Sequence, residues 1–288
     1  MKIDRQIIIR DVKNSNFNTL RMVLLTFCLV FLLVKTNAQE LPFQDGETLN
    51  FDIRYKYGLV TMKAGTAKFN TDFVTFEKNK TIRSTLNFKT TSFFDKIYKM
   101  QDTLTSYSSI PHLKPIFHLR IANEAGNHVK EEMKILKHSF NYSEVNTKLY
   151  KKEQLSIDTT LVADLPGYDI ISMLTFIRSL DYDKIKYGNV NEVAFFMGKK
   201  KINIIIRSKG TAVISINSKK YNTFLFSVDF TDDAFTESNS AMEIWISDDG
   251  NRIPIRLKAK LKIGAAEANL TSYKNLKYPL SSEINLKN

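Results

Sequence analysis

The chain has 288 residues, a formal charge of +12 at pH 7 and a single cysteine, Cys28. This length is enough for one large β domain with a core of its own. One cysteine excludes an intramolecular disulfide and a metal site built from paired cysteines. The positive surplus favours contact with anionic surfaces such as lipid headgroups or envelope polysaccharide. A lysine-rich, solvated surface is the plainer explanation of the same charge.

The first 38 residues have the pattern of a secretory signal peptide. Basic residues precede an apolar run, residues 22–34, which only Thr26 interrupts, and the small residue Ala38 follows. A run of this length suits a signal peptide better than a membrane span. We therefore expect cleavage after Ala38 and a mature domain of residues 39–288, with no membrane-spanning segment after cleavage. The first 38 residues carry six basic and two acidic side chains, so the mature chain keeps a surplus of eight positive charges.

Alternating apolar and polar residues predict β-strands through the first half of the mature chain. The clearest strand runs through Leu49, Phe51, Ile53 and Tyr55. The small residues that follow, 64–67, predict a bulge or a close approach of two strands. Further elements are expected as strands at residues 69–76, 82–88, 117–121 and 129–135, with one helical turn at residues 92–98.

One segment departs from the β pattern. Apolar residues recur at three- and four-residue spacing from Ile170 to Leu180, and Asp169 stands where an N-cap is expected. The spacing predicts one central amphipathic helix that packs on a curved sheet or plugs it, with Leu174 and Ile177 in the core.

The last third returns to the strand pattern. Strands are predicted at residues 190–197, 202–207, 211–216 and 221–230, with Gly198 and Gly210 marking turns. A closing hairpin follows around an Asp-Asp-Gly-Asn turn at residues 248–251. Its second strand alternates, and we expect its apolar side chains to line the core: Ile253, Ile255, Leu257, Ala259, Leu261 and Ile263. One more strand at residues 265–273 precedes a loose tail.

These elements predict a mainly β fold. The strands are short, consecutive and separated by turn residues, which indicates a single domain of antiparallel, meandering strands. We expect a curved sheet or a barrel-like structure with one central amphipathic helix.

Basic residues occupy the other face of the closing strand and form the best candidate for a functional surface. We call them the basic stripe: Arg252, Arg256, Lys258, Lys260 and Lys262. Like charges on one strand face repel unless acids or anions lie opposite them. The stripe is a candidate site for an anionic ligand; the alternative is a solvated outer face that protects a sheet edge.

Three groups of residues together resemble one known family. They are Gly46-Glu47 with the first strand and Ala64-Gly65-Thr66-Ala67; Asp169 and Ser172 with Arg178-Ser179-Leu180; and residues 244–249 with 252–256. The set resembles the bacterial "domain of unknown function 3108" family over about residues 46–273. The resemblance implies an exported, mainly β protein of the Gram-negative envelope, in the periplasm or on the outer envelope. It implies no activity.

Motifs for enzyme chemistry are missing from the sequence. There is no nucleophile elbow, no zinc-protease motif and no phosphate-binding glycine loop. Pairing across the turn at residues 124–127 would place His118 opposite Glu132 and His128 opposite Ala122. The two histidines would then lie about 13 Å apart along the sheet, too far for one zinc ion. The turn at residues 248–251 has oxygen ligands that suit calcium, but those residue types are also what a hairpin turn needs. We therefore expect no metal and no cofactor.

Two classes of function fit these observations best. One is a non-catalytic binding module that holds a lipid or another apolar ligand against the concave face of the sheet. The other is a structural or interaction protein of the envelope. An uncharacterised envelope hydrolase is a third alternative, although no group of residues supports it. Nucleic acid is a poor partner for an exported chain without a recognition motif.

Overall fold

The computed structural model describes residues 40–230, 241–261 and 263–284. Residues Leu41–Asn288 form one compact unit, to which the following description applies. The signal peptide expected at residues 1–38 lies outside the described residues, and so do Lys262 and residues 285–288.

The described residues form a sixteen-stranded sheet in which most neighbouring strands are consecutive in sequence. Spatially, the order is β8-β7-β6-β5-β4-β3-β2-β1-β15-β14-β13-β12-β11-β10-β9, and β16 pairs with β12. The strands are β1 (Glu47–Tyr57), β2 (Val60–Phe76), β3 (Asn79–Thr90), β4 (Met100–Ser109), β5 (Pro115–Glu124), β6 (Asn127–Ser139), β7 (Tyr142–Lys151), β8 (Gln154–Ala163), β9 (Gly167–Tyr168), β10 (Val190–Met197), β11 (Lys200–Ile216), β12 (Lys219–Phe230), β13 (Met242–Ser247), β14 (Pro254–Lys260), β15 (Ala265–Lys274) and β16 (Glu283–Ile284).

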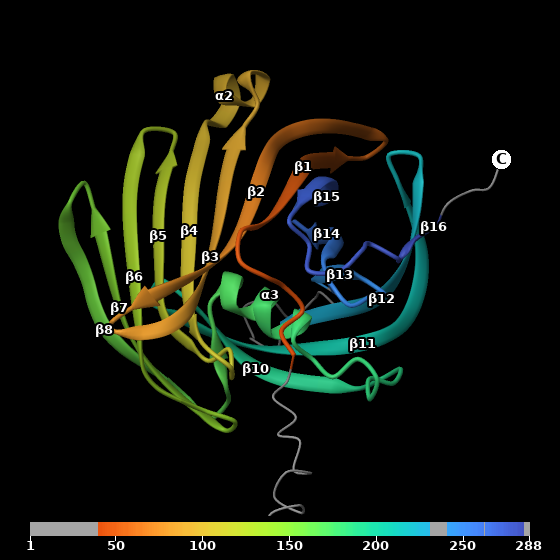
Figure 1. Ribbon diagram of the computed structural model, residues 1–288. Helices are drawn as coiled ribbons and strands as arrows, with labels where there is room; N and C mark the ends of the chain where they lie inside the picture. The colour runs from red at the N-terminus through yellow and green to blue at the C-terminus, as the bar shows by residue number, and fades with distance from the viewer. Residues whose placement is uncertain (1–39, 231–240, 262, 285–288) are drawn as a thin grey trace, which may run out of the picture. The chain divides into compact units, whose positions relative to one another are not determined.

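The sheet curls until its two ends nearly meet, which makes it barrel-like (Figure 1). Side-chain contacts bridge the two ends. The hydroxyl of Ser143 in β7 donates to the carbonyl of Leu165, just before β9. The amide of Gly198, after β10, donates to the Glu131 carboxylate in β6 at 2.7 Å. The prediction of a mainly β, barrel-like domain is confirmed.

Small residues near the start of β2 allow two strands to approach closely, as predicted. The pairing of β1 with β2 shifts between Ile53 and Arg54, opposite Gly65. A Cβ atom at Gly65 would lie only 2.5 Å from the carbonyl oxygen of Lys89 in β3. Glycine is therefore required here by the close approach of neighbouring backbone.

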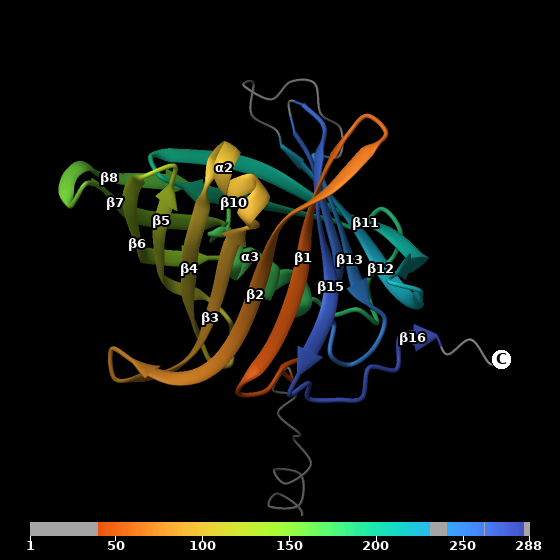
Figure 2. The ribbon, with the colours of Figure 1, turned by 90° about the horizontal axis from the view of Figure 1, so that it is seen from above.

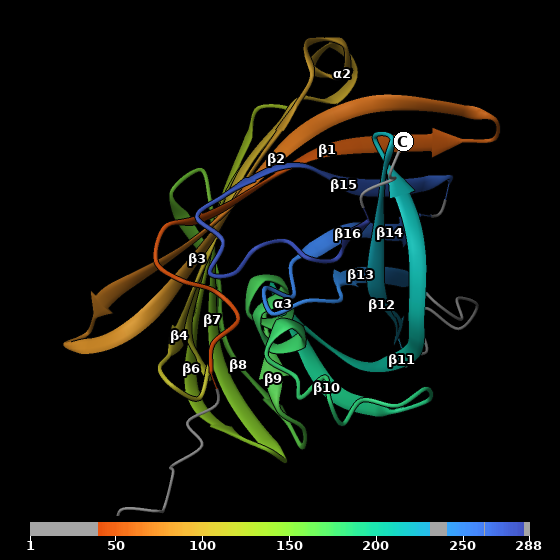
Figure 3. The same cartoon turned by 45° about the vertical axis from the view of Figure 1, so that its right-hand side comes forward.

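Two helices interrupt the strands. The short helix α2 (Ser92–Tyr98) connects β3 to β4, where the sequence predicts a helical turn. The longer helix α3 (Ile170–Arg178) lies within the curve of the sheet (Figure 3) and corresponds to the predicted central helix. Asp169 is its N-cap, as expected, and forms a capping box with Ser172. Ile177 of α3 is fully buried and Leu174 is half-buried.

One predicted turn is wrong. Residues 202–207 and 211–216 were expected to be separate strands with a turn at Gly210, but both belong to the single long strand β11. The pairing of β11 with β12 shifts between Ser208 and Thr211, and Gly210 has φ of +79°. A glycine in the left-handed conformation produces a bulge here, and the strand bends without ending.

The closing hairpin forms, but its alternation is broken. Strand β13 pairs with β14 across the Asp-Asp-Gly-Asn turn, where the Asp249 carboxylate accepts from the Asn251 amide at 2.9 Å. The register shifts between Trp245 and Ile246, so Ile246 pairs with Pro254 and not with Ile255. This bulge changes which side chains share a face, because two residues of one strand then oppose one residue of the other.

The prediction that Leu261 and Ile263 line the core is wrong. Ile253 and Ile255 are fully buried and Leu257 is half-buried, but Leu261 is 47% exposed and Ile263 is 64% exposed. Strand β14 ends at Lys260, which pairs with Ala265. The tip of the β14–β15 hairpin extends beyond the core. The alternation of apolar and polar residues continues into this tip, but its apolar side chains are exposed.

Residues after β15 pack on the sheet as far as the structure describes them. Leu276 and Leu280 join the core cluster around Ile253 and Ile255. The Asn251 side chain donates to the Tyr278 carbonyl at 2.9 Å and accepts from the Tyr278 amide at 2.8 Å. These contacts hold residues 275–284 against the closing turn.

Candidate functional site

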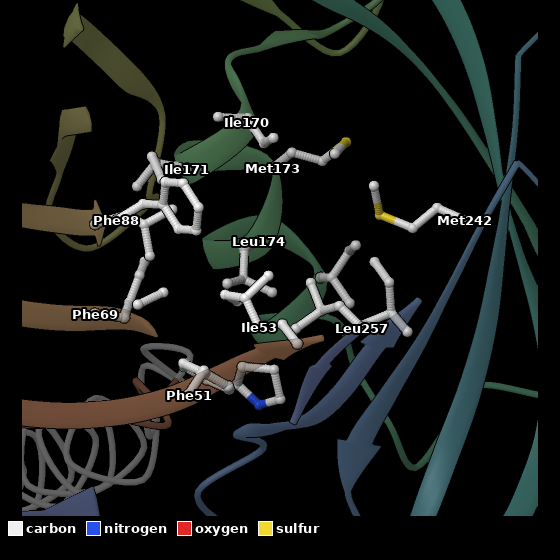
Figure 4. Close-up of a pocket in the computed structure, with 16 residues that line it drawn as sticks. Phe51, Ile53, Phe69, Phe88, Ile170, Ile171, Met173, Leu174, Met242 and Leu257 are labelled. Atoms are coloured by element: carbon white, nitrogen blue, oxygen red, sulfur yellow. The ribbon is translucent and has the colours of Figure 1, made fainter. Parts of the chain in front are cut away.

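The candidate site is an apolar cavity between α3 and the concave face of the sheet (Figure 4). Its volume is about 230 Å³, and sixteen side chains line it. All of them are apolar: Phe51, Ile53, Ala67, Phe69, Leu86, Phe88, Ile170, Ile171, Met173, Leu174, Ile177, Met242, Ile244, Pro254, Leu257 and Ala268.

The sheet supplies its share of this lining because residues two apart on a strand point to the same face. Phe51 and Ile53 come from β1, Phe69 comes from the neighbouring strand β2, and Phe88 comes from β3, on the far side of β2. On the opposite wall Met242 projects from β13 and Leu257 from β14. The cavity therefore depends on strands that are about 200 residues apart in sequence, which the pairing of β15 with both β1 and β14 brings together.

Helix α3 forms the remaining wall. Its apolar residues lie at three- and four-residue spacing, so Ile170, Leu174 and Ile177 share the face that meets the cavity. Ile170 is 40% exposed, so the lining reaches solvent beside the first turn of the helix.

A buried ion pair fixes the C-terminal end of α3. The Arg178 guanidinium donates to both carboxylate oxygens of Glu47 in β1, at 2.6 and 2.8 Å. It also donates to the carbonyls of Asn251 and Arg252 at 3.0 Å each. The guanidinium lies over the ring of Phe43, with 5.0 Å to its centroid. Four of the five guanidinium N–H groups therefore hold the helix against β1 and the closing turn.

The comparisons with known proteins agree with this architecture. Residues 50–271 match the family described as "Protein of unknown function (DUF3108)". The chain belongs to the DUF3108 family. The resemblance noted in the sequence is thereby confirmed, and the matched range includes all sixteen residues of the cavity lining. No curated protein matches the chain.

Solved structures similar in fold to this DUF3108 protein include one of another domain of unknown function. It is the crystal structure of a β-barrel-like protein of domain of unknown function DUF1849 from Brucella abortus. The two share 8% sequence identity with a TM-score of 0.54, and the similarity covers 81% of this chain and 99% of that one. At this identity the likeness shows the barrel-like fold alone.

A second buried group lies at the N-terminal end of α3 in the DUF3108 protein. The Asp169 carboxylate accepts from the backbone amides of Ile171 and Ser172 and from the hydroxyls of Ser106 and Ser172. Nδ1 of His118 in β5 lies 3.1 Å from Oδ1 of Asp169. These contacts fix the start of α3 to β4 and β5, as Arg178 fixes its end to β1.

The environment of this group shifts two pKa values. Burial alone would lower the pKa of His118, but the neighbouring Asp169 carboxylate outweighs burial and raises it. Burial alone would raise the pKa of Asp169, but His118 and the Ser172 hydrogen bonds hold it well below its usual range. The hydroxyl of Ser106 donates to Asp169 and is not activated by His118, so this geometry positions a helix and is not that of a nucleophile-base pair.

Metal binding has no support in the part of the chain that the structure describes. No group of three or more His, Cys, Asp or Glu side chains there could hold a metal ion. The predicted register around the turn at residues 124–127 is wrong by one residue: His118 pairs with Met133 and His128 with Asn123. The two-residue turn pairs Glu124 with Asn127 and so sets this register.

The structure distributes the basic stripe among different environments. Arg252 donates to the Leu180 carbonyl at 2.8 Å and lies over the Tyr182 ring. Arg256 donates to the Asn269 side chain at 2.8 Å and to the Ser215 carbonyl at 3.2 Å, and it lies over Trp245. Arg256 thus connects β14 to neighbouring strands, and Arg252 connects the closing turn to the segment after α3.

The lysines of the stripe lie further along the strand. Lys258 is half-buried, and its Nζ lies 4.0 Å from the Glu243 carboxylate across the hairpin. Lys260 is exposed at the end of β14. Lys262 lies outside the described residues. The stripe is therefore not one continuous ligand surface over the residues that the structure describes.

The sequence patterns did not predict the Arg178–Glu47 pair or most of the cavity lining. A signal for the pair was present, because Arg178 falls among the apolar positions of an amphipathic helix, where a charge needs a partner. Its partner lies 131 residues away, and no local pattern identifies Glu47 as that residue. Among the described residues no helix is long and apolar enough to cross a membrane.

Proposed function

We propose that this protein is an exported, non-catalytic lipid-binding protein of the cell envelope that holds an acyl chain in the barrel. The observation that carries the proposal is the cavity of about 230 Å³ whose sixteen lining residues are all apolar. One water molecule needs roughly 10–15 Å³ of such volume, so the cavity has room for several methylene groups. An apolar chain gains from this transfer out of water, whereas a polar ligand would lose its hydrogen bonds.

The same observation argues against catalysis at this site. A reaction needs groups that accept or donate protons or stabilise charge beside the substrate. The cavity lining offers no such group. At the two ends of α3, the polar groups of Arg178 and Asp169 form hydrogen bonds that position the helix.

Export is supported by the sequence pattern of residues 1–38 and by the barrel beginning after it, at Leu41. N-terminal sequencing of protein from the envelope fraction should give a first residue at or near Gln39. Cytoplasmic protein that still begins at Met1 would contradict export to the envelope.

The ligand is tested by extracting purified protein with organic solvent and analysing the extract by mass spectrometry. We expect an acyl-chain lipid in stoichiometric amount. A blank extract, together with no uptake of the fluorescent fatty acid cis-parinaric acid, would overturn lipid binding and favour a structural or interaction role in the envelope.

A cavity-filling variant locates the ligand. Ala268 lines the cavity, and Ala268→Phe places a ring inside it. We expect the affinity for cis-parinaric acid to fall about tenfold or more, because the added ring occupies the volume of several methylene groups. Ala212 of β11 is also half-buried and does not line the cavity. Ala212→Phe is therefore the matched control and should retain binding; equal affinities of the two variants would place the ligand elsewhere.

A further inference from the structure

Exposed apolar side chains gather at one end of the barrel. They belong to three connections: the β1–β2 turn, helix α2 and the β14–β15 turn. We call this set the rim: Tyr57, Leu59, Phe93, Ile97, Leu261 and Ile263. Leu59 is 102% exposed and Ile97 is 68% exposed, so neither contributes to a core. Helix α2 has no buried residue at all, and its Phe93 and Ile97 project from one face at i, i+4 spacing.

The three connections are neighbours in space. The amide of Thr91, which caps α2, donates to the carbonyl of Ala64 in β2 at 2.9 Å. The Tyr55 hydroxyl of β1 donates to the carbonyl of Ile263 at 3.0 Å. Figure 2 shows α2 and the tips of both hairpins at the upper edge of the molecule. The rim therefore presents its apolar side chains at one end, from loops that are distant in sequence.

Lysines surround the rim. Lys56, Lys89, Lys96 and Lys99 are all exposed on β1, on β3 and around α2. The described residues include no salt bridge to any of these four side chains. Asp95 is the acidic residue of α2. Apolar tips among uncompensated lysines are the pattern of a surface that binds anionic lipid headgroups and inserts side chains below them.

An apolar strand face runs from the cavity to the rim. On β1, Ile53 lines the cavity, and Tyr55 and Tyr57 follow at two-residue spacing. On β14, Leu257 lines the cavity and Ala259 follows, and Leu261 lies directly after the last residue of the strand. Residues at this spacing share a face of the sheet. The face that holds the cavity thus ends at the exposed tips.

We propose that the rim docks this protein on an anionic lipid bilayer, with Leu59, Ile97 and their neighbours among the acyl chains and the lysines at the headgroups. Single exposed apolar residues are common on proteins, but a group from three separate connections at one end is not explained by folding. The proposal goes beyond ligand binding: it assigns a partner to a surface outside the cavity and stands whether or not the cavity holds a lipid.

Vesicle sedimentation tests the docking surface. The chain beginning at Gln39 is used, because it contains the whole barrel with its cores, whereas the apolar run at residues 22–34 would bind vesicles by itself. We expect it to bind vesicles of equal parts phosphatidylcholine and phosphatidylglycerol, and to bind pure phosphatidylcholine much more weakly. Added salt should weaken the binding, because it screens the lysines.

Matched variants separate the rim from the rest of the surface. Leu59→Asp with Ile97→Asp should lower vesicle affinity about tenfold or more. Phe140 is 87% exposed at the β6–β7 turn, at the other end of the barrel, so Phe140→Asp is the control and should bind as the wild type does. Lys96→Gln with Lys99→Gln should weaken binding and reduce its salt dependence. Lys78→Gln with Lys80→Gln, in the β2–β3 turn and at the start of β3, should change neither.

Three outcomes would overturn the proposal. They are no binding of the unmodified chain to anionic vesicles, equal binding of the rim and control variants, and a rim that serves only for self-association, seen as a dimer that Leu59→Asp dissociates without any vesicle binding. Uptake of cis-parinaric acid, measured on the same variants without vesicles, should be unchanged. Loss of vesicle binding with intact uptake therefore concerns the rim alone, and loss of uptake with intact vesicle binding concerns the cavity alone.

Discussion

Arg178 and Glu47 form a two-hydrogen-bond ion pair in which the side chains are 1% and 0% exposed. The pair joins the last turn of α3 to the first residue of β1. Ile177, the residue before Arg178, lines the apolar cavity, so the pair fixes the end of α3 next to the cavity. A buried ion pair adds little net stability, because the cost of removing both charges from water offsets their attraction. Removing one partner is costly, because it leaves the other charge buried and unpaired.

Removing one partner should therefore be severe. Glu47→Gln or Arg178→Met should each lower the free energy of unfolding by about 3–5 kcal/mol, because the remaining charge or donor stays buried without its partner. Urea denaturation measures this directly. Lys219→Gln breaks the partly exposed pair with Glu283 and is the control, with an expected loss of about 0–1 kcal/mol.

A double variant distinguishes pairing from simple packing. Glu47→Gln combined with Arg178→Met should cost clearly less than the sum of the two single changes, because no unpaired carboxylate is then left behind. Strict additivity would show that the two side chains do not act as a pair.

The His118–Asp169 contact should make stability depend on pH. The pKa of folded His118 is raised above its ordinary value of about 6.5. The stabilisation from the charged histidine is thus complete below about pH 6.5 and is lost as the pH rises through the raised pKa. The advantage of the wild type over His118→Gln should therefore shrink as the pH rises above about 6.5, as measured by urea midpoints.

His138 supplies a control of opposite sign. Burial and the charge of Lys114 lower the pKa of His138 to about 4. A neutral buried histidine stabilises above about pH 6.5, and this contribution is lost as the pH falls toward the lowered value. His138→Gln should therefore gain on the wild type as the pH falls. If both variants follow the wild-type pH profile, neither histidine is linked to folding.

The two predicted core residues of α3 should differ in their cost on truncation. Ile177 is fully buried, so Ile177→Ala should cost about 2–5 kcal/mol. Leu174 is half-buried and already faces the cavity, so Leu174→Ala should fall toward the lower end of that range and enlarge the ligand volume. Denaturant midpoints of the two variants test whether Ile177→Ala costs more than Leu174→Ala. Equal losses would show that the neighbouring cavity does not reduce the cost of truncating Leu174.

The basic stripe should divide into structural and surface residues. Arg256→Gln removes two hydrogen bonds and the contact with Trp245, and it should destabilise the fold by about 1–3 kcal/mol. Lys258→Gln should stay within about 0.5 kcal/mol of the wild type. Thermal unfolding of both variants is the measurement. A greater loss at Lys258 than at Arg256 would contradict this division.

The fold class was accessible from the sequence because it depends on local periodicity. The alternation in β1, the three- and four-residue spacing in α3 and the N-cap Asp169 each involve only near neighbours. The errors arise where one extra residue, a β-bulge, shifts the alternation of side chains between the two faces of a strand. At Gly210 a bulge continues one strand where two separate strands were predicted. Beside Trp245 a second bulge shifts the pairing, and Pro254 lines the cavity whereas Ile255 does not. A register shift is decided by the partner strand, which periodicity does not contain.

The sequence by itself determined the strand content, the central helix and its cap, and the apolar character of one face of each strand. Only the tertiary structure decided that these faces enclose a cavity, that Arg178 meets Glu47, and that Leu261 and Ile263 lie beyond the core. Local patterns arise from the geometry of a single helix or strand. Cavities, buried ion pairs and exposed ends depend on which distant segments the curling of the sheet brings together, so they appear only once the barrel has formed.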